Sequence, residues 1–212
     1  MNKKTILSGV AALSIVISGY IYAENNVIQA SKETNSITTD QTATKSEDYD
    51  YTTAEFIREG RGYNISWSFD QLSENVDLIV EVIPTGDRNH IYDTDVFGGV
   101  GIGITETNVN VSNVIKGDES LENTKITVNE NYYSRDNGKT FTTSDDYTPL
   151  RNGGKYILFL VKEASNETYS IWALQQGKYN MDNTDPSEEE VEKRNQHYKE
   201  LKDQVKNKYK ES

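Results

Sequence analysis

Hydrophobic and polar residues alternate along several short segments of the chain, as they do in β-strands with one buried face. The alternation is clear over residues 76–83, 125–129 and 168–174. Residues 156–161 are instead apolar at every position, which is typical of a central strand covered on both faces. Residues that favour turns separate these segments. The pattern therefore predicts a mainly β domain.

A glycine-rich stretch precedes the longest alternating segment. Gly99, Gly101 and Gly103 alternate with apolar residues, which permits close backbone approach and sharp bending of a strand. After Ile104 the alternation changes phase, which predicts a β-bulge. The glycine spacing is not that of a dinucleotide-binding fingerprint, and no Gly-Lys-Ser/Thr follows. We therefore expect a curved strand here, not a phosphate-binding loop.

Three polar segments read as turns between strands. Residues 84–89 contain Pro and Gly and are expected to end the strand over 76–83. Residues 135–140 carry an Asn-Gly pair, which favours a tight hairpin. Residues 164–167 join 155–161 to 168–174 in a second hairpin.

A short helical turn is predicted within residues 68–75, with Ser68 or Asp70 as its N-cap. Just before it, Ile65, Trp67 and Phe69 alternate as the residues of a short strand would. The first packed element of the domain is therefore expected to be a strand that leads directly into a helical turn.

Residues 186–212 are predicted to form one helix of about 24 residues. Asp185 can cap its start, Pro186 suits the first helical position, and Glu188 stands where a capping box needs an acid. The apolar stripe on this helix is thin. We therefore expect an accessory element, whose removal after Asp185 leaves a folded β domain.

These elements together predict a small, mostly antiparallel, OB-like β-barrel of five or six strands over about 63–180, followed by a C-terminal α-helix. Two stacked open sheets are the alternative. The expected domain boundaries are a signal segment over 1–23, a disordered spacer over 24–52, the barrel domain over 53–185 and the charged helix over 186–212.

The N-terminus has the order of charge, apolar run and small residue that marks a secretory signal. Lys3 and Lys4 precede an apolar run over 6–21, and Ala23 stands before a polar segment. The run is long enough that an uncleaved anchor is the rival interpretation. Either interpretation places the rest of the chain outside the cell or on the outer face of its envelope. The following residues 24–52 are polar and are expected to act as a flexible spacer.

Composition excludes several function classes. The chain has no cysteine, which rules out disulfides, thiol catalysis and cysteine-based zinc sites. Residues 51–185 carry 21 acidic against 11 basic residues, a balance of −10 within the total of −12. Such a charge repels phosphate backbones and anionic membranes. We expect no nucleic-acid partner and no membrane contact beyond the possible anchor.

The sequence contains no recognisable catalytic, cofactor or metal motif. Its only two histidines, His90 and His197, lie in different segments. Asp93 and Asp95 lack the surrounding pattern of a calcium-binding loop, and with Asp87 they read as parts of a solvated acidic loop. We therefore predict no catalytic residue, no cofactor and no bound metal.

Fourteen tyrosines stand beside only five phenylalanines. Tyrosine combines a large contact area with a polar tip, so Tyr132, Tyr133, Tyr147 and Tyr179 are candidates for a binding face. The alternative is that these tyrosines serve as strand formers in a sheet with one wet face.

Four segments, in order, carry a resemblance to a known group of proteins: the strand at 77–80, the strand end at 114–118, Pro149-Leu150 followed by the glycines and strand of 153–160, and the terminal turn at 176–179. In this order the chain resembles uncharacterised exported proteins of Gram-positive bacteria over about residues 68–180. More distantly it resembles the OB-type barrel of netrin and metalloproteinase-inhibitor domains. Those domains carry cysteines that this chain lacks, so the resemblance implies the fold and not metalloproteinase inhibition.

The function that fits export, a spacer, an acidic domain and no catalytic motif is a secreted or surface-associated, non-enzymatic binding or adaptor module. Its partner would be a protein or another component of the envelope. An extracellular enzyme whose acidic residues meet only in space, or a protease-inhibitor-like module, are the alternatives. The deepest pocket separates the first two, because converging buried carboxylates would favour an enzyme and a shallow groove lined by tyrosine would favour binding.

Overall fold

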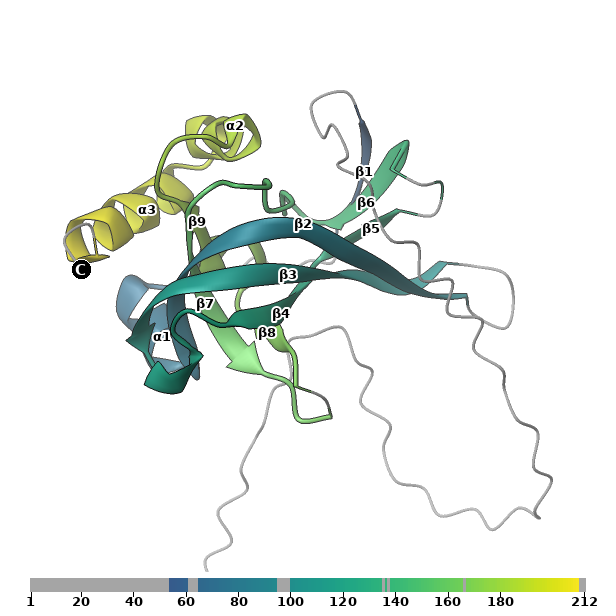
Figure 1. The fold of residues 1–212 in the computed structure, drawn as a ribbon. Coiled ribbons are helices and arrows are strands. Elements are labelled where there is room, and N and C mark those ends of the chain that lie inside the picture. Colours follow the sequence, from purple (N-terminus) through teal and green to yellow (C-terminus); the bar gives the residue numbers. More distant parts are fainter. Residues whose placement is uncertain are drawn as a thin grey trace, which may run out of the picture. The chain divides into compact units, whose positions relative to one another are not determined.

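The computed structural model describes residues 54–60, 65–94, 100–134, 136, 138–165 and 167–209 (Figure 1). The expected signal segment and spacer lie outside these residues. The strands are β1 Glu55–Glu59, β2 Leu78–Thr94, β3 Val100–Lys116, β4 Lys125–Glu130, β5 Tyr132–Ser134, β6 Thr140–Ser144, β7 Tyr156–Lys162, β8 Tyr169–Ile171 and β9 Lys178–Asn180. The helices are α1 Phe69–Glu74, α2 Pro186–Arg194 and α3 Gln196–Tyr209, with short 3-10 turns at Glu119–Leu121 and Leu174–Gly177.

Five of the strands form a closed ring. β2 pairs with β3, β3 with β4, β8 with β7 and β7 with β2, all antiparallel, while β4 and β8 run parallel. β9 pairs with the beginning of β7, beside β8. The prediction of a mainly β fold with a C-terminal helical segment is confirmed.

A second, three-stranded sheet has the order β1-β6-β5. β5 and β6 form the antiparallel hairpin predicted over 135–140, and Gly138 has the positive φ of 81° that such a turn needs. β1 runs parallel to β6, with Phe56 opposite Phe141. This sheet brings the first described strand against the middle of the chain.

β2 does not end at residue 84, so the turn predicted over 84–89 is wrong. The strand continues beyond Pro84, and its pairing with β3 shifts between Pro84 and Arg88, which lie opposite Val109 and Thr107. Three residues of β2 therefore face one residue of β3. The Pro and Gly that suggested a turn are accommodated as a bulge inside a long strand, and Arg88 comes to lie inside the molecule.

The bulge predicted after Ile104 is also misplaced. The odd-numbered residues of β3 from Gly103 to Val111 are all buried, so the alternation keeps its phase through this stretch. The register shifts instead further along, where Val82 pairs with Val111 but Glu81 pairs with Asn113. Gly103 does allow a close approach, since a Cβ there would lie 2.3 Å from the ring of Tyr133.

Two apolar cores lie on opposite faces of β7. The inner core fills the ring and the space toward the second sheet; its largest members are Tyr132, Phe141, Tyr147, Leu150, Tyr156 and Leu158. The outer core lies between the other face of β7 and the helices; it contains Leu72, Ile157, Phe159, Tyr179, Val191, Tyr198, Leu201 and Val205. The expectation that this strand is covered on both faces is confirmed.

The helical turn predicted near residue 70 is present as α1. Ser68 caps it in a full capping box, because its Oγ accepts from Gln71 N at 3.2 Å and Gln71 Oε1 accepts from Ser68 N at 2.9 Å. The short strand predicted before it is wrong, since 65–68 are not in a strand. Trp67 instead packs against Trp172 and donates its backbone N–H to Gln176.

The C-terminal segment forms two helices and not one. The break falls at Asn195, which has φ −126° and ψ 94° and whose Oδ1 caps α3 by accepting from Tyr198 N at 3.0 Å. Val191, Leu201 and Val205 are almost fully buried. The thin apolar stripe is therefore largely buried, and this packing argues against the predicted accessory role.

Candidate functional site

A pocket of about 350 Å³ lies where three segments meet: β1, the stretch after β6, and the beginning of α2. Its walls include the apolar groups of Ala54, Phe56, Tyr147, Pro149 and Pro186. Residues far apart in the sequence form these walls, so no contiguous motif marks the pocket.

Charged residues flank this pocket. Asp146 Oδ1 pairs with Arg58 NH1 at 2.9 Å and with Arg194 NH2 at 3.1 Å. Both arginines line the pocket, together with Glu190, which pairs with Lys193. Exposed pairs of this kind contribute little to stability. Their effect here is to hold two guanidinium groups next to an apolar recess.

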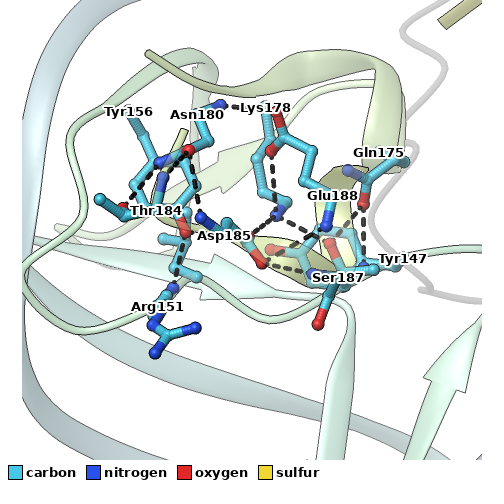
Figure 2. A network of polar contacts seen from close by, with 12 residues as sticks. Tyr147, Arg151, Tyr156, Gln175, Lys178, Asn180, Thr184, Asp185, Ser187 and Glu188 are labelled. Carbon is cyan, nitrogen blue, oxygen red and sulfur yellow. Dashed lines mark hydrogen bonds and ion pairs between the residues drawn. The ribbon is translucent and has the colours of Figure 1, made fainter. Parts of the chain in front are cut away.

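Behind the pocket lies a buried polar network that reaches from β9 to α2 (Figure 2). Lys178 is fully buried, and its Nζ donates to Thr148 Oγ1 at 2.9 Å. The Nζ lies over two rings, 5.7 Å from the centroid of Tyr147 and 5.2 Å from that of Tyr156. Thr148 and Tyr147 also line the pocket, so they connect the two sites.

Two carboxylates surround Lys178. Its Nζ is 3.5 Å from Asp185 Oδ2 and 3.6 Å from Glu188 Oε2. A second buried lysine, Lys202 of α3, pairs with Glu188 Oε1 at 2.7 Å. The pKa of Lys202 is raised: burial acts to lower it, but Glu188 and the nearby Glu192 outweigh that effect. The two lysines balance the two buried acids.

Asp185 has two further roles. Its Oδ1 caps α2 by accepting from Ser187 N at 3.0 Å and Glu188 N at 3.3 Å, as predicted for the helix start. Its Oδ2 accepts from the Tyr156 hydroxyl at 2.9 Å, and this hydroxyl accepts from Arg151 N at 2.9 Å. Burial and the negative charge of Asp185 raise the pKa of Tyr156.

Glu188 does not complete a capping box. Its Oε1 accepts from the backbone N–H of Asn180 at 2.7 Å as well as from Lys202. Its Oε2 is buried and accepts no hydrogen bond from any described residue. Glu188 thus joins β9, α2 and α3, and its Oε2 lies 3.6 Å from Lys178 Nζ.

A third buried carboxylate, Glu130, lies in the inner core at the end of β4. Its Oε2 accepts from Tyr147 Oη at 2.8 Å and from Leu150 N at 2.7 Å, and its Oε1 accepts from Thr107. Arg88 Nε is 3.9 Å away. Burial raises the pKa of Glu130, although Arg88 and the hydrogen bonds oppose the rise.

The two histidines lie in different parts of the structure. His90 is buried in the ring, where its Nδ1 is 2.7 Å from Thr105 Oγ1, and burial and the nearby Arg88 lower its pKa to about 4. His197 lies on α3, with Nε2 3.0 Å from the carbonyl oxygen of Trp67. Among the described residues, no group of three or more His, Cys, Asp or Glu could hold a metal ion.

All four tyrosines of the predicted binding face are buried. Tyr132 and Tyr147 belong to the inner core, Tyr133 lies against Gly103, and Tyr179 stacks on Tyr198 in the outer core. They therefore form no exposed face in this structure. Tyr147 alone among the four lines the pocket. Tyr132, Tyr147 and Tyr179 fill the two cores, and Tyr147 lies outside the strands.

Of the acidic loop candidates Asp87, Asp93 and Asp95, the structure describes only the Asp87 side chain. Asp87 forms an exposed pair with Lys125 at 3.6 Å, and Asp146 is occupied with the two arginines beside the pocket. Asp95 and the side chain of Asp93 lie outside the described residues.

The buried charges that organise the site were not found from the sequence. Lys178 follows the Gln-Gln-Gly stretch of an apparent turn, and Glu130 ends a polar strand. The nearest signal in the sequence is the Asp-Pro-x-Glu start of α2, which by its local pattern predicts only a capping box. An acid at that position can equally turn inward when lysines on neighbouring elements face it.

No family model and no curated protein sequence matches this chain. Within the described part of the chain, none of the helices has both the length and the apolar character needed to cross a membrane.

Proposed function

We propose that this chain is a secreted or surface-associated, non-enzymatic binding module whose scaffold is a small OB-like barrel. The ring of five strands supports the barrel, since its mostly antiparallel pairing and single parallel contact, between β4 and β8, match a compact five-stranded barrel. The export signal read from the N-terminus supports the location.

The pocket between β1 and α2 is the observation that carries the binding function. A concave site with apolar walls and a few fixed polar groups is the usual form of a ligand site. Here Phe56 and Pro149 contribute to the apolar walls, and Arg58 and Arg194 supply positive charge beside them. This site lies outside the ring, so it differs from the curved barrel face that the fold alone would suggest.

The chemistry of the pocket favours a segment of a protein partner that presents an apolar side chain next to a carboxylate. The apolar side chain would enter the recess, and the carboxylate would meet Arg58 or Arg194 in place of Asp146. The domain as a whole is negatively charged and repels a carboxylate. The two arginines provide local positive charge that a carboxylate can approach.

The buried carboxylates favour binding over acid-base catalysis at this pocket. Glu130, Asp185 and Glu188 each lie against a buried cation and are almost completely covered. A general acid or base must reach its substrate directly or through one water molecule. Glu190, the acid that does line the pocket, is exposed and paired with Lys193.

The test uses two acetylated dipeptide amides, Phe-Glu and Phe-Lys, as probes in NMR titrations of the full chain. We expect Phe-Glu to shift the amide signals of pocket residues and Phe-Lys to shift them less. Ala54→Trp should abolish the shifts because the indole fills the recess, and Arg194→Glu should remove the preference for Phe-Glu. Lys199→Glu is the matched control, since Lys199 lies on α3 and does not line the pocket.

Absence of pocket shifts with both probes would contradict the proposal. Equal shifts with Phe-Glu and Phe-Lys would refute the role given to the arginines. A pull-down from medium and washed envelopes, with Ala54→Trp as the comparison, then identifies a partner whose capture depends on the pocket.

A further inference from the structure

We propose that Lys178 and Asp185 condense into an intramolecular isopeptide bond, with Glu188 as the group that moves the protons. The bond would join β9 to the first turn of α2. It concerns the buried network and is independent of the ligand proposed for the pocket.

The three reacting side chains are close together and shielded from water. Lys178 Nζ is 3.5 Å from Asp185 Oδ2, and Lys178, Asp185 and Glu188 are 0%, 3% and 0% exposed. A nucleophile and a carboxyl group held at this separation react as one molecule, with the large effective concentration of an intramolecular step. Figure 2 shows the lysine side chain directed at both acids.

The reaction balances without any other reactant. The Nζ of Lys178 forms a bond to Cγ of Asp185, and the bond from Cγ to Oδ2 breaks. Two protons of the ammonium group leave with Oδ2 as one molecule of water, and the third stays on the amide nitrogen. No oxidant, cofactor or activated group is needed.

Glu188 Oε2 is placed to carry those protons. It lies 3.6 Å from Lys178 Nζ and accepts no hydrogen bond from the described residues, so it is free to take a proton. The Tyr156 hydroxyl donates to the departing Oδ2 at 2.9 Å and can assist its release as water. After condensation, the new amide N–H would donate to the Oε2 that lacks a partner.

The charges around the site remain balanced in the product. Condensation removes one positive and one negative charge, and Glu188 keeps Lys202 as its partner at 2.7 Å. A buried ion pair carries a large desolvation penalty, which a neutral amide avoids. Asp185 Oδ1 becomes the amide oxygen and still caps α2 through Ser187 N and Glu188 N.

Peptide mapping of the denatured full chain tests the proposal. Trypsin cleaves after an unmodified Lys178 and releases residues 163–178 and 179–193 as separate peptides. A condensed Lys178 is not cleaved. We then expect a single peptide 163–193 that is lighter than the sequence by one water molecule, with fragment ions that place the link on Asp185.

Two variants separate the roles of the residues. Glu188→Gln keeps the shape of the side chain but cannot take a proton, and we expect its condensed fraction to fall at least tenfold. Glu189→Gln is the matched control, because it makes the same change at the next position of α2, where the side chain is exposed and outside the buried network. Circular dichroism of both variants shows whether each is folded.

Separate peptides from the wild-type protein, after prolonged incubation at neutral pH, would overturn the proposal. A link at Glu188 instead of Asp185 would overturn the assignment of the bond. A folded Glu188→Gln variant that condenses as fully as the wild type would refute the role of Glu188.

Discussion

The inner core and the outer junction, where β9 meets the two C-terminal helices, bury charge in two different ways. In the inner core, Glu130 is held by hydrogen bonds from neighbouring loops and strands, with Arg88 as its nearest cation. At the outer junction, Lys178 and Lys202 alternate with Asp185 and Glu188 between β9 and the two C-terminal helices. The inner charges fix strands that already pair with each other. The outer charges join elements that share few backbone hydrogen bonds.

This difference indicates which part of the structure each network stabilises. The inner carboxylate organises the loop over Tyr147 and Leu150 that approaches the pocket. The outer network specifies how α2 and α3 sit on the ring. A single break should therefore damage the folded ring in the first case and the docking of the helices in the second.

Removal of α2 and α3 should have the largest effect. Truncation after Asp185 deletes Val191, Leu201 and Val205, each worth about 1.5–3 kcal/mol of burial, against a total stability of about 5–15 kcal/mol for a typical domain. It also leaves Lys178 without Glu188. We expect the cooperative thermal transition followed by circular dichroism to be lost.

A sharp transition in the truncated protein would show that the ring folds alone. The two C-terminal helices would then be the accessory element that the thin apolar stripe predicts. The outer junction would not be needed to hold the folded ring together, which would contradict the comparison above.

Substitution of Glu130 by Ala should have the next largest effect on the free energy of unfolding. It leaves Arg88 buried without its carboxylate and removes the acceptor for Tyr147 and Leu150. Breaking a buried pair in this way costs about 3–5 kcal/mol, measurable by urea unfolding. Asp87→Ala, which breaks the exposed pair with Lys125, is the control and should cost no more than about 1 kcal/mol.

Acidification should destabilise the inner core through His90. The folded protein holds its pKa at about 4, below the ordinary 6.5, so the unfolded state binds the extra proton first. Stability is therefore fully present above pH 6.5 and is lost as pH falls toward 4, by about 3 kcal/mol at 1.36 kcal/mol per pH unit. His90→Gln should make the unfolding free energy less dependent on pH in this window. An unchanged pH profile in that variant would show that other groups control the acid response.

Loss of the α1 cap should have the smallest effect of the four. Ser68→Ala removes the acceptor for Gln71 N and should cost about 1 kcal/mol. Because α1 packs in the outer layer, the change should lower stability and leave the pocket titration unchanged. A shift of the Phe-Glu affinity in this variant would reveal coupling between the outer layer and the pocket.

The sequence predicted the elements that depend on neighbouring residues. The cap at Ser68, the Asn-Gly hairpin, the doubly covered strand at 156–161 and the start of α2 all follow from residues within a few positions of each other. The break at Asn195 was missed because its local signal is a single polar residue inside a helical pattern.

The site depends on contacts that local patterns do not encode. Pro84 and Gly86 resemble a turn in sequence, yet pairing with β3 keeps them in a strand. Lys178 and Glu130 look like surface residues until distant acids, hydroxyls and amides are brought around them by ring closure. The sequence could not predict the exposure of the tyrosines either, because a tyrosine in a strand can lie on the buried or the exposed face.

Closure of the ring sets an order of events during folding. β2 pairs with β7, so Leu78 must find Leu160, and β4 must find β8 across about half that stretch of chain. The chain must lose the entropy of closing a long loop before such distant pairings contribute favourable free energy. They therefore slow folding relative to local contacts. A growing chain therefore cannot complete its ring until β7 and β8 have been synthesised, and until then the sheet of β2, β3 and β4 keeps open edges on β2 and β4 that can pair with other chains.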